Sequence, residues 1–161
     1  MERETNTADD LALFHCLVAE ARAKAGEAEG ALAELAVARD QFELIGLRYW
    51  LPEVWRTIAD LTIRVDPTAW SETAAAYDEA ERIAGEQGAG RLALRAALGA
   101  TRLGLLAAGD GNGAATRLGR ALGGVIEAEE AASDVRDARA LLATIGKHGR
   151  IGAPVARSGA T

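Results

Sequence analysis

Apolar residues recur along most of the chain at steps of three and four, which is the period of a helix with one buried face. Glycine or proline separates the successive stripes, as at Gly26, Gly46, Gly88 and the pair Asp66-Pro67. Pro52 suits the first turn of a helix, where its missing N–H is no loss. The pattern predicts helices over 9–25, 28–45, 52–65, 69–86, 91–107, 114–130 and 133–145.

Short connections between these helices favour antiparallel pairs. We expect three hairpins and a capping helix, over about 9–46, 47–88, 89–131 and 133–145. The folded domain is then expected to span 8–146. Residues 147–161 contain no acidic residue and little periodicity, so they are expected to form a disordered tail. The predicted fold class is all-α: an α-solenoid of three antiparallel hairpins with a C-terminal capping helix.

The second helices of the predicted hairpins repeat one pattern. Each carries a small, a large and a small residue at steps of four and three, and the register advances by 42 and then 41 residues. The three sets are Ala31/Leu35/Ala38, Thr73/Tyr77/Ala80 and Ala114/Leu118/Ala121. The small residues let the helices of a hairpin approach, and the large one fills space toward the next hairpin. In the first helix of the chain, the apolar stripe expected to face the core is Leu11, Phe14, Val18, Ala21 and Ala25.

Several short fragments, taken in their order and spacing, point to a known family. They are Gly46-Leu47-Arg48-Tyr49-Trp50, Glu53-Val54-Trp55-Arg56, Ala84-Gly85-Glu86-Gln87-Gly88-Ala89, Leu94-Arg95-Ala96-Ala97 and Ala138-Arg139-Ala140-Leu141-Leu142. From about Ala28 to Thr144 the chain resembles the tetratricopeptide-like (TPR-like) C-terminal region of large bacterial signalling ATPases. Many of these are joined to adenylate or guanylate cyclase domains or to transcriptional regulators. The resemblance implies a solenoid whose first helices line a concave groove and whose second helices form the convex back.

The chain departs from these relatives because it has no nucleotide-binding sequence. No Gly-x-x-x-x-Gly-Lys-Ser/Thr stretch occurs. The glycine-rich segment from Gly109 to Gly113 lacks a following Lys and leaves a helix rather than a strand, so it is interpreted as a hairpin turn. We therefore expect neither ATP nor cyclase chemistry. The chain is interpreted as a stand-alone adaptor or as the remnant of a larger, split regulator.

Composition and charge limit which residues can build the core, in which compartment the protein is expected and what it is expected to bind. The chain is 49% hydrophobic but only 4% aromatic, so Ala, Leu, Val and Ile must build the core. The 18 Lys and Arg against 24 Asp and Glu give a net charge of -6, which disfavours nucleic acid. The single Cys16 cannot form an intrachain disulfide. Without a basic leader or a long apolar run the chain is expected to be soluble and cytoplasmic, with no membrane partner; self-association stays open.

Few residues suit catalysis or metal binding. His15 and His148 are the only histidines, and neither is spaced for metal ligation. His15 beside Cys16 on an apolar helix is interpreted as structural. The carboxylate runs at 78–81 and 127–130 are interpreted as solvated helix faces. We expect no catalytic site, no cofactor and no metal.

Charge is distributed unevenly between the two helices of each predicted hairpin. The first helices, counted over 9–24, 52–65 and 91–107, carry seven basic and five acidic residues. The second helices, counted over 27–45, 69–87 and 113–130, carry four basic and thirteen acidic residues. In the arrangement that the resemblance implies, the groove is mildly basic and the back is acidic. Arg91, Arg95 and Arg102 share one helical face, so they are expected to pair with carboxylates of an acidic partner segment. The alternative is that they form salt bridges with neighbouring hairpins.

The candidate partner-binding residues are Arg56, Arg64, Arg91, Arg95, Arg102, Trp50 and Trp55. The aromatic cluster of Tyr49, Trp50 and Trp55 either wedges hairpins one and two together or forms a binding hot spot. These residues are compatible with two functions, which belong to different functional classes. One is a non-enzymatic adaptor or scaffold that binds a protein or acidic peptide segment in a bacterial signalling or transcription-regulatory system. The other is a small-ligand or nucleic-acid sensor with a cavity or basic groove between helices.

Overall fold

The computed structural model describes residues 14–107, 111–125 and 132–151, and every regular element in these ranges is helical. The helices are 14–24, α2 (Ala28–Leu44), α3 (Leu51–Val65), α4 (Trp70–Glu86), α5 (Gly90–Ala107), α6 (Gly111–Gly123) and α7 (Ser133–Ile151). A 3-10 turn, η1 (Arg48–Trp50), leads into α3. The prediction of an all-α fold is confirmed for these residues.

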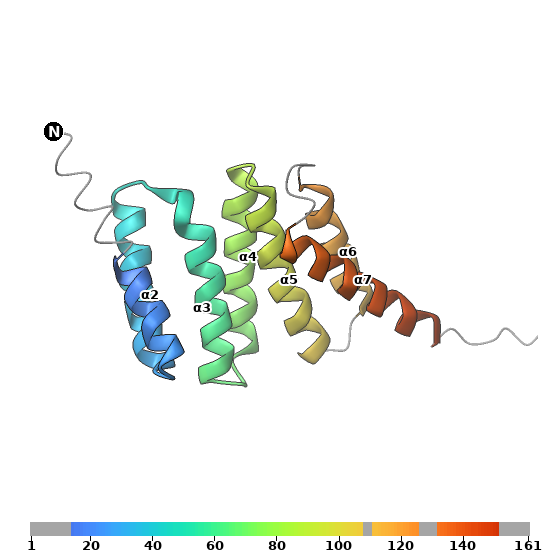
Figure 1. Cartoon of the computed structure of the whole chain (residues 1–161), viewed down its shortest axis with the longest axis horizontal. Helices are drawn as coiled ribbons and strands as arrows, with labels where there is room; N and C mark the ends of the chain where they lie inside the picture. Colours follow the sequence, from blue (N-terminus) through green and yellow to red (C-terminus); the bar gives the residue numbers. More distant parts are fainter. Residues whose placement is uncertain (1–13, 108–110, 126–131, 152–161) are drawn as a thin grey trace, which may run out of the picture.

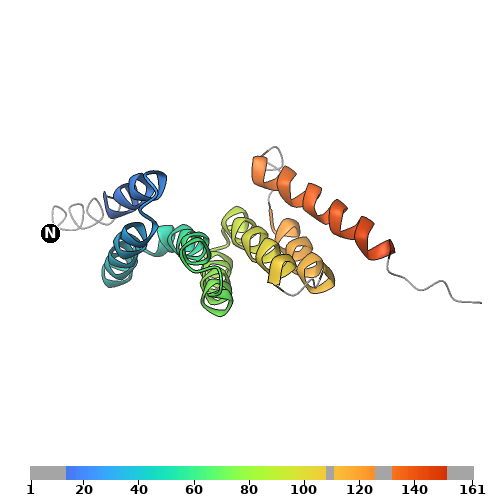
Figure 2. The same cartoon turned by 90° about the horizontal axis from the view of Figure 1, so that it is seen from below.

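The helices stand side by side in a row that follows the chain (Figure 1). From α2 onward each helix packs on the next one, and α3 also contacts α5, as α5 contacts α7. Figure 2 shows two layers. Helix 14–24, α3, α5 and α7 form the first-helix layer, and α2, α4 and α6 form the second-helix layer.

Three of the turns share one backbone geometry. Each has a glycine with a positive φ two positions after the last helical residue, at Gly26, Gly46 and Gly88. The N–H of the following residue donates to the carbonyl five positions back, as from Leu47 to Phe42 at 3.0 Å. Only glycine adopts this left-handed conformation without steric cost, so these positions end their helices sharply. The predicted stops at Gly26, Gly46 and Gly88 are confirmed.

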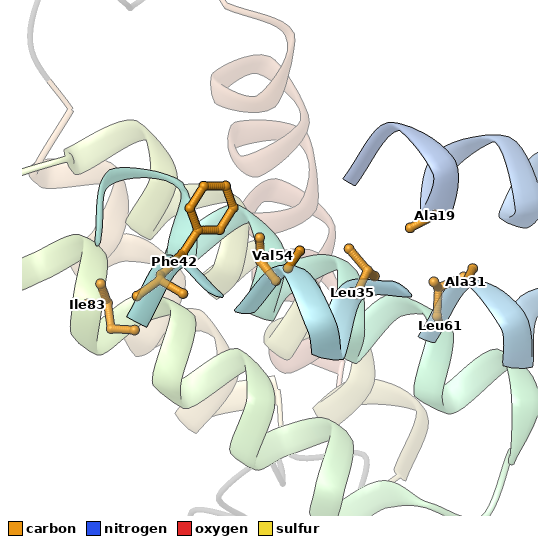
Figure 3. Packing of buried hydrophobic residues seen from close by; sticks show 9 residues of the cluster. Ala19, Ala31, Leu35, Phe42, Val54, Leu61 and Ile83 are labelled. Atoms are coloured by element: carbon orange, nitrogen blue, oxygen red, sulfur yellow. The ribbon is translucent and has the colours of Figure 1, made fainter. Parts of the chain in front are cut away.

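The core consists mainly of alanine and leucine, with few large side chains. In the cluster of hairpin one, Phe42 of α2 lies near Val54 of α3 and Ile83 of α4, while Ala19 and Ala31 meet where helix 14–24 packs on α2 (Figure 3). Small side chains let helix axes approach closely, and dispersion contacts then fill the space between them. A core of this composition has little free volume for a larger side chain.

The small-large-small positions are the buried faces of the second helices. Eight of the nine residues are buried: Ala31, Leu35, Ala38, Thr73, Tyr77, Ala80, Leu118 and Ala121. Ala114, the ninth, is half-buried near the start of α6. The repeat read from the sequence therefore corresponds to equivalent packing positions in α2, α4 and α6.

Tyr77 shows how a large repeat residue reaches the next hairpin. Its ring lies against Gly99 of α5, where an added Cβ would come within 2.4 Å of the ring. Its hydroxyl donates a hydrogen bond to Asp60 of α3. Burial, and then this hydrogen bond, raise the pKa of Tyr77, so the phenol stays protonated and acts as a donor at neutral pH. Gly99 thus makes room for the ring that joins α3, α4 and α5.

The buried face predicted for the first helix is wrong. Phe14 and Ala21 are exposed, and Ala19 is the buried residue that packs on α2. Ala19 is almost fully buried in a cluster with Ala31, and its small side chain lets helix 14–24 approach α2 closely. Leu11, which belonged to the same predicted stripe, lies outside the described residues, and Ala25 is exposed in the turn.

Some predicted boundaries also differ. Helix α6 begins at Gly111, inside the segment interpreted as a turn, and ends at Gly123 rather than near 130, where Gly123 and Gly124 lower helix propensity. Residues 108–110 and 126–131 lie outside the described ranges. Helix α7 continues to Ile151, so the tail predicted from 147 begins within a helix; an exposed Gly146 weakens a helix without ending it. Residues 152–161 are not described.

We predict that Ala38→Leu and Ala80→Leu each lower the free energy of unfolding by about 1–3 kcal/mol, because both alanines are fully buried between helices. Chemical denaturation monitored by circular dichroism measures the change. The matched controls are Ala33→Leu in α2 and Ala75→Leu in α4, which are exposed and should alter stability little. Equal effects at buried and exposed positions would contradict the packing register.

We predict that Gly99→Ala destabilises the protein, whereas Gly104→Ala in the same helix stabilises it by up to about 1 kcal/mol. The Cβ at position 99 would collide with the Tyr77 ring, but nothing lies within 4 Å of a Cβ at position 104. Thermal unfolding of the two variants gives the comparison. If both substitutions raise the melting temperature, Tyr77 and Gly99 are not in contact.

Candidate functional site

The first-helix layer carries two adjoining grooves. The apolar groove, about 630 Å³, lies between helix 14–24 and α3, and Leu35 of α2 also lines it. The polar groove, about 370 Å³, lies between α3, α5 and α7. Arg56, Asp60 and Arg95 line both grooves, so the two form one continuous surface.

A chain of charged groups crosses the polar groove from α3 to α7. Asp60, which accepts the Tyr77 hydrogen bond, pairs with Arg56. Arg56 also pairs with Glu53, whose Oε1 lies 2.7 Å from Arg56 Nη2 and 2.9 Å from Arg95 Nη2.

The chain continues onto α7 through one carboxylate. Asp134 Oδ2 lies 3.0 Å from Arg91 Nε and 4.0 Å from Arg95 Nε. Beside it, Arg102 Nη2 lies 3.6 Å from Asp137 Oδ2. Arg95 thus lies between Glu53 of α3 and Asp134 of α7, and Arg91 and Arg102 also pair with carboxylates of α7. The network ties α5 to α7.

Arg56 is the least exposed arginine of this network. Burial by itself lowers the pKa of Arg56, but Glu53 and then Asp60 outweigh burial and raise it. The guanidinium therefore stays charged, and its charge is already compensated by two carboxylates of its own helix. Ion pairs of this kind position side chains more than they add stability.

The structure brings four of the predicted arginines together. Arg56, Arg91, Arg95 and Arg102 all line the polar groove, as the shared face of the last three suggested. Each also pairs with a carboxylate of this chain. For Arg91, Arg95 and Arg102 that carboxylate belongs to another helix, as in the alternative interpretation. That these arginines bind an acidic partner stays a prediction, and a partner carboxylate would have to compete with the internal ones.

The other three candidates separate into two environments. Trp55 packs against the buried clusters of hairpins one and two, with the Arg39 guanidinium 5.1 Å from its ring centre. Trp50 instead lines the apolar groove, with 42% of its surface exposed. Arg64 lines the same groove. Within the described part of the chain, Trp55 therefore packs between hairpins, whereas Trp50 and Arg64 are available to a ligand.

The apolar groove has a buried floor and an exposed rim. Leu35, Val54 and Leu61 form the floor and are nearly inaccessible to solvent. Leu17 on helix 14–24 and Trp50, the last residue of η1, form the rim, and 65% of Leu17 is exposed. An exposed leucine beside an exposed tryptophan above an apolar floor is a surface that a partner can cover.

Sequence reasoning missed the contribution of helix 14–24 to this groove. Its lining residues are Cys16, Leu17, Glu20 and Ala23. They recur at steps of three and four, so the same periodicity could have found them. The stripe through Phe14 and Ala21 was chosen instead, because the sequence does not show which side of a terminal helix is covered.

The described residues offer little that suits catalysis. His15 Nδ1 lies 2.7 Å from Glu34 Oε2 of α2, which joins the two helices of hairpin one. Burial raises the pKa of the Cys16 thiol, so it is not an activated thiolate. No group of three His, Cys, Asp or Glu in the described ranges could hold a metal ion. None of the helices over those ranges is long and apolar enough to span a membrane.

Comparisons of the chain with models of protein families, with curated proteins and with solved structures gave no match. The TPR-like resemblance of the sequence fragments therefore stays a prediction. Inference about function starts from the geometry of the two grooves.

We predict that Cys16, the only cysteine of the chain, is alkylated more slowly in the folded protein than in a peptide of the surrounding sequence. Burial shields the thiol and raises its pKa, so less thiolate is present at pH 8. Mass spectrometry of the iodoacetamide reaction follows the rate. Unfolding in urea should bring the rate to that of the peptide, and equal rates before unfolding would place Cys16 outside the groove wall.

Proposed function

We propose that this chain is a non-enzymatic protein-interaction module: an α-solenoid of three TPR-like hairpins, closed by α7, that binds a segment of another protein on its first-helix layer. The observation that carries the proposal is the apolar groove between helix 14–24 and α3, with Leu17 and Trp50 exposed on its rim. The module would act as an adaptor in a bacterial signalling or transcription-regulatory system in the cytoplasm.

Three features support the solenoid. The turns at Gly26, Gly46 and Gly88 repeat one geometry, the repeat positions are buried in α2, α4 and α6, and the helices alternate between two layers. Units of this kind bury their apolar faces on their neighbours and leave one layer open as an extended surface. In such an arrangement, the first-helix layer is the concave side.

The energetics favour the apolar groove as the main binding site. Burying a large apolar side chain contributes about 1.5–3 kcal/mol, and the rim offers both a leucine and a tryptophan. Tryptophan is enriched among the residues that dominate protein interfaces. The polar groove contributes less, because a partner's carboxylate gains Arg95 or Arg102 only by displacing Glu53, Asp134 or Asp137. The polar groove would orient the partner and make its binding dependent on salt.

The same pairing weakens the case for a small-ligand or nucleic-acid sensor. A polyanion needs uncompensated positive charge, whereas the arginines of the polar groove are interleaved with Asp60, Asp134 and Asp137. Protein binding is therefore the function that the geometry supports best.

Affinity capture from a lysate of the source organism tests the proposal. The wild-type chain is compared with Leu17→Glu and with Leu106→Glu, a matched change at a leucine that is 78% exposed on α5 and lines neither groove. We expect one protein to be recovered in stoichiometric amount by the wild type and by Leu106→Glu, and to be lost with Leu17→Glu. Both variants should retain the wild-type helical dichroism.

Two outcomes would contradict the proposal. One is capture that is identical for the two glutamate variants, which would place binding elsewhere. The other is recovery of a small molecule or a nucleic acid in place of a protein, which would favour the sensor.

A further inference from the structure

The apolar groove has a direction and a length. Trp50 and Arg64 mark its ends along α3, and 14 residues of helix rise by about 21 Å. Gly26, in the turn after helix 14–24, and Val65, the last residue of α3, line one pocket of about 520 Å³, so the C-terminal ends of the two helices lie together. The groove therefore runs between two parallel helices and has Arg64 at their C-terminal end.

The walls of this groove offer side chains but no backbone groups. Both walls are helices, whose N–H and C=O groups are bonded within the helix except near its ends. An extended segment laid on the apolar floor would bury backbone groups without partners, which is costly. A helix satisfies its own backbone and presents only side chains, and about 21 Å corresponds to four of its turns.

The charged side chains that line the groove are not all paired. On helix 14–24, Glu20 is paired with Lys24 at 2.6 Å, and on α3 Arg56 is paired within the network. Among the described residues Arg64 has no ion pair, so one positive charge stands unmatched at the C-terminal end of the groove. A carboxylate of the occupant would complement it.

The helix dipoles favour placing the N-terminal end of an occupant helix at the Arg64 end of the groove. The C-terminal ends of helix 14–24 and α3 carry partial negative charge, which attracts the positive N-terminal end of a third helix. Acidic residues are also favourable in the first turn of a helix. A helix that enters antiparallel to α3 thus brings both its positive end and its acidic first turn to the Arg64 end. Its apolar face then extends toward Leu17 and Trp50.

We infer that the occupant of the apolar groove is an amphipathic partner helix of about four turns, antiparallel to α3, with an acidic residue in its first turn at Arg64. Its apolar side chains recur at steps of three and four and cover Leu17 and Trp50. This assignment rests on the proposed function and specifies the partner's chemistry.

Selection from a phage-displayed library of random 16-residue peptides against the full-length chain tests the inference. We expect enriched peptides to share a helical apolar period, with Asp or Glu near their N-terminal end. Bound peptide should acquire helical dichroism and slow the alkylation of Cys16, which lines the groove. The enriched peptides are then synthesised, and their affinity is measured for three variants of the chain.

The three variants separate the apolar contribution to peptide affinity from the contribution of charge. Leu17→Glu should weaken binding at least about tenfold through the lost apolar contact. Arg64→Glu should weaken it about two- to fivefold and shift a repeated selection toward basic N-terminal residues. The matched control is Arg120→Glu on α6, which makes the same charge change in the second-helix layer and should leave affinity unchanged.

The outcomes distinguish the inference from the proposed function. Enriched peptides that depend on Leu17 but lack a helical period, or that carry acid at the C-terminal end, overturn the helix assignment and leave the interaction module intact. Failure to enrich any peptide overturns the assignment as well. If peptides are enriched but none depends on Leu17, the groove is not the binding surface and both fail.

Discussion

Helices in this chain approach one another across alanine and glycine, and that close approach determines where everything else lies. Ala31, Ala38 and Ala80 have no exposed surface, and Gly99 accepts the Tyr77 ring where any Cβ would collide. Because α3, α4 and α5 are drawn together at this point, Glu53 and Arg95 come within ion-pair distance on the first-helix layer. The polar network is thus a consequence of packing in the core.

The same constraint explains the apolar groove. A core built from small residues buries little area per helix, so helix 14–24, the first helix of the described residues, keeps large side chains exposed. Helix 14–24 places Ala19 against α2 and leaves Leu17 beside Trp50 over an apolar floor. The interior of the row is closed by packing, whereas helix 14–24 and α3 retain a surface that a partner can complete.

Most of the fold could be predicted from local signals in the sequence. The parts that could not be predicted have one cause in common. Glycine stops, Pro52 and the small-large-small register are local or periodic signals, and they located the helices and the faces of α2 and α4. The face of helix 14–24 depends on which neighbour covers it, and that information is not local. The arginines were placed on one surface correctly, but their partners Asp134 and Asp137 come from α7, 43 and 35 residues farther along the chain.

The central claim is that the groove between helix 14–24 and α3 holds a protein segment. Photocrosslinking from position 17 tests it most directly, with p-benzoylphenylalanine replacing Leu17 in one chain and Leu106 in another. Both leucines are exposed, but only Leu17 lines the groove. The account predicts a crosslink to one protein from position 17 and none from position 106, and equal crosslinking from both, or none from position 17, would contradict it.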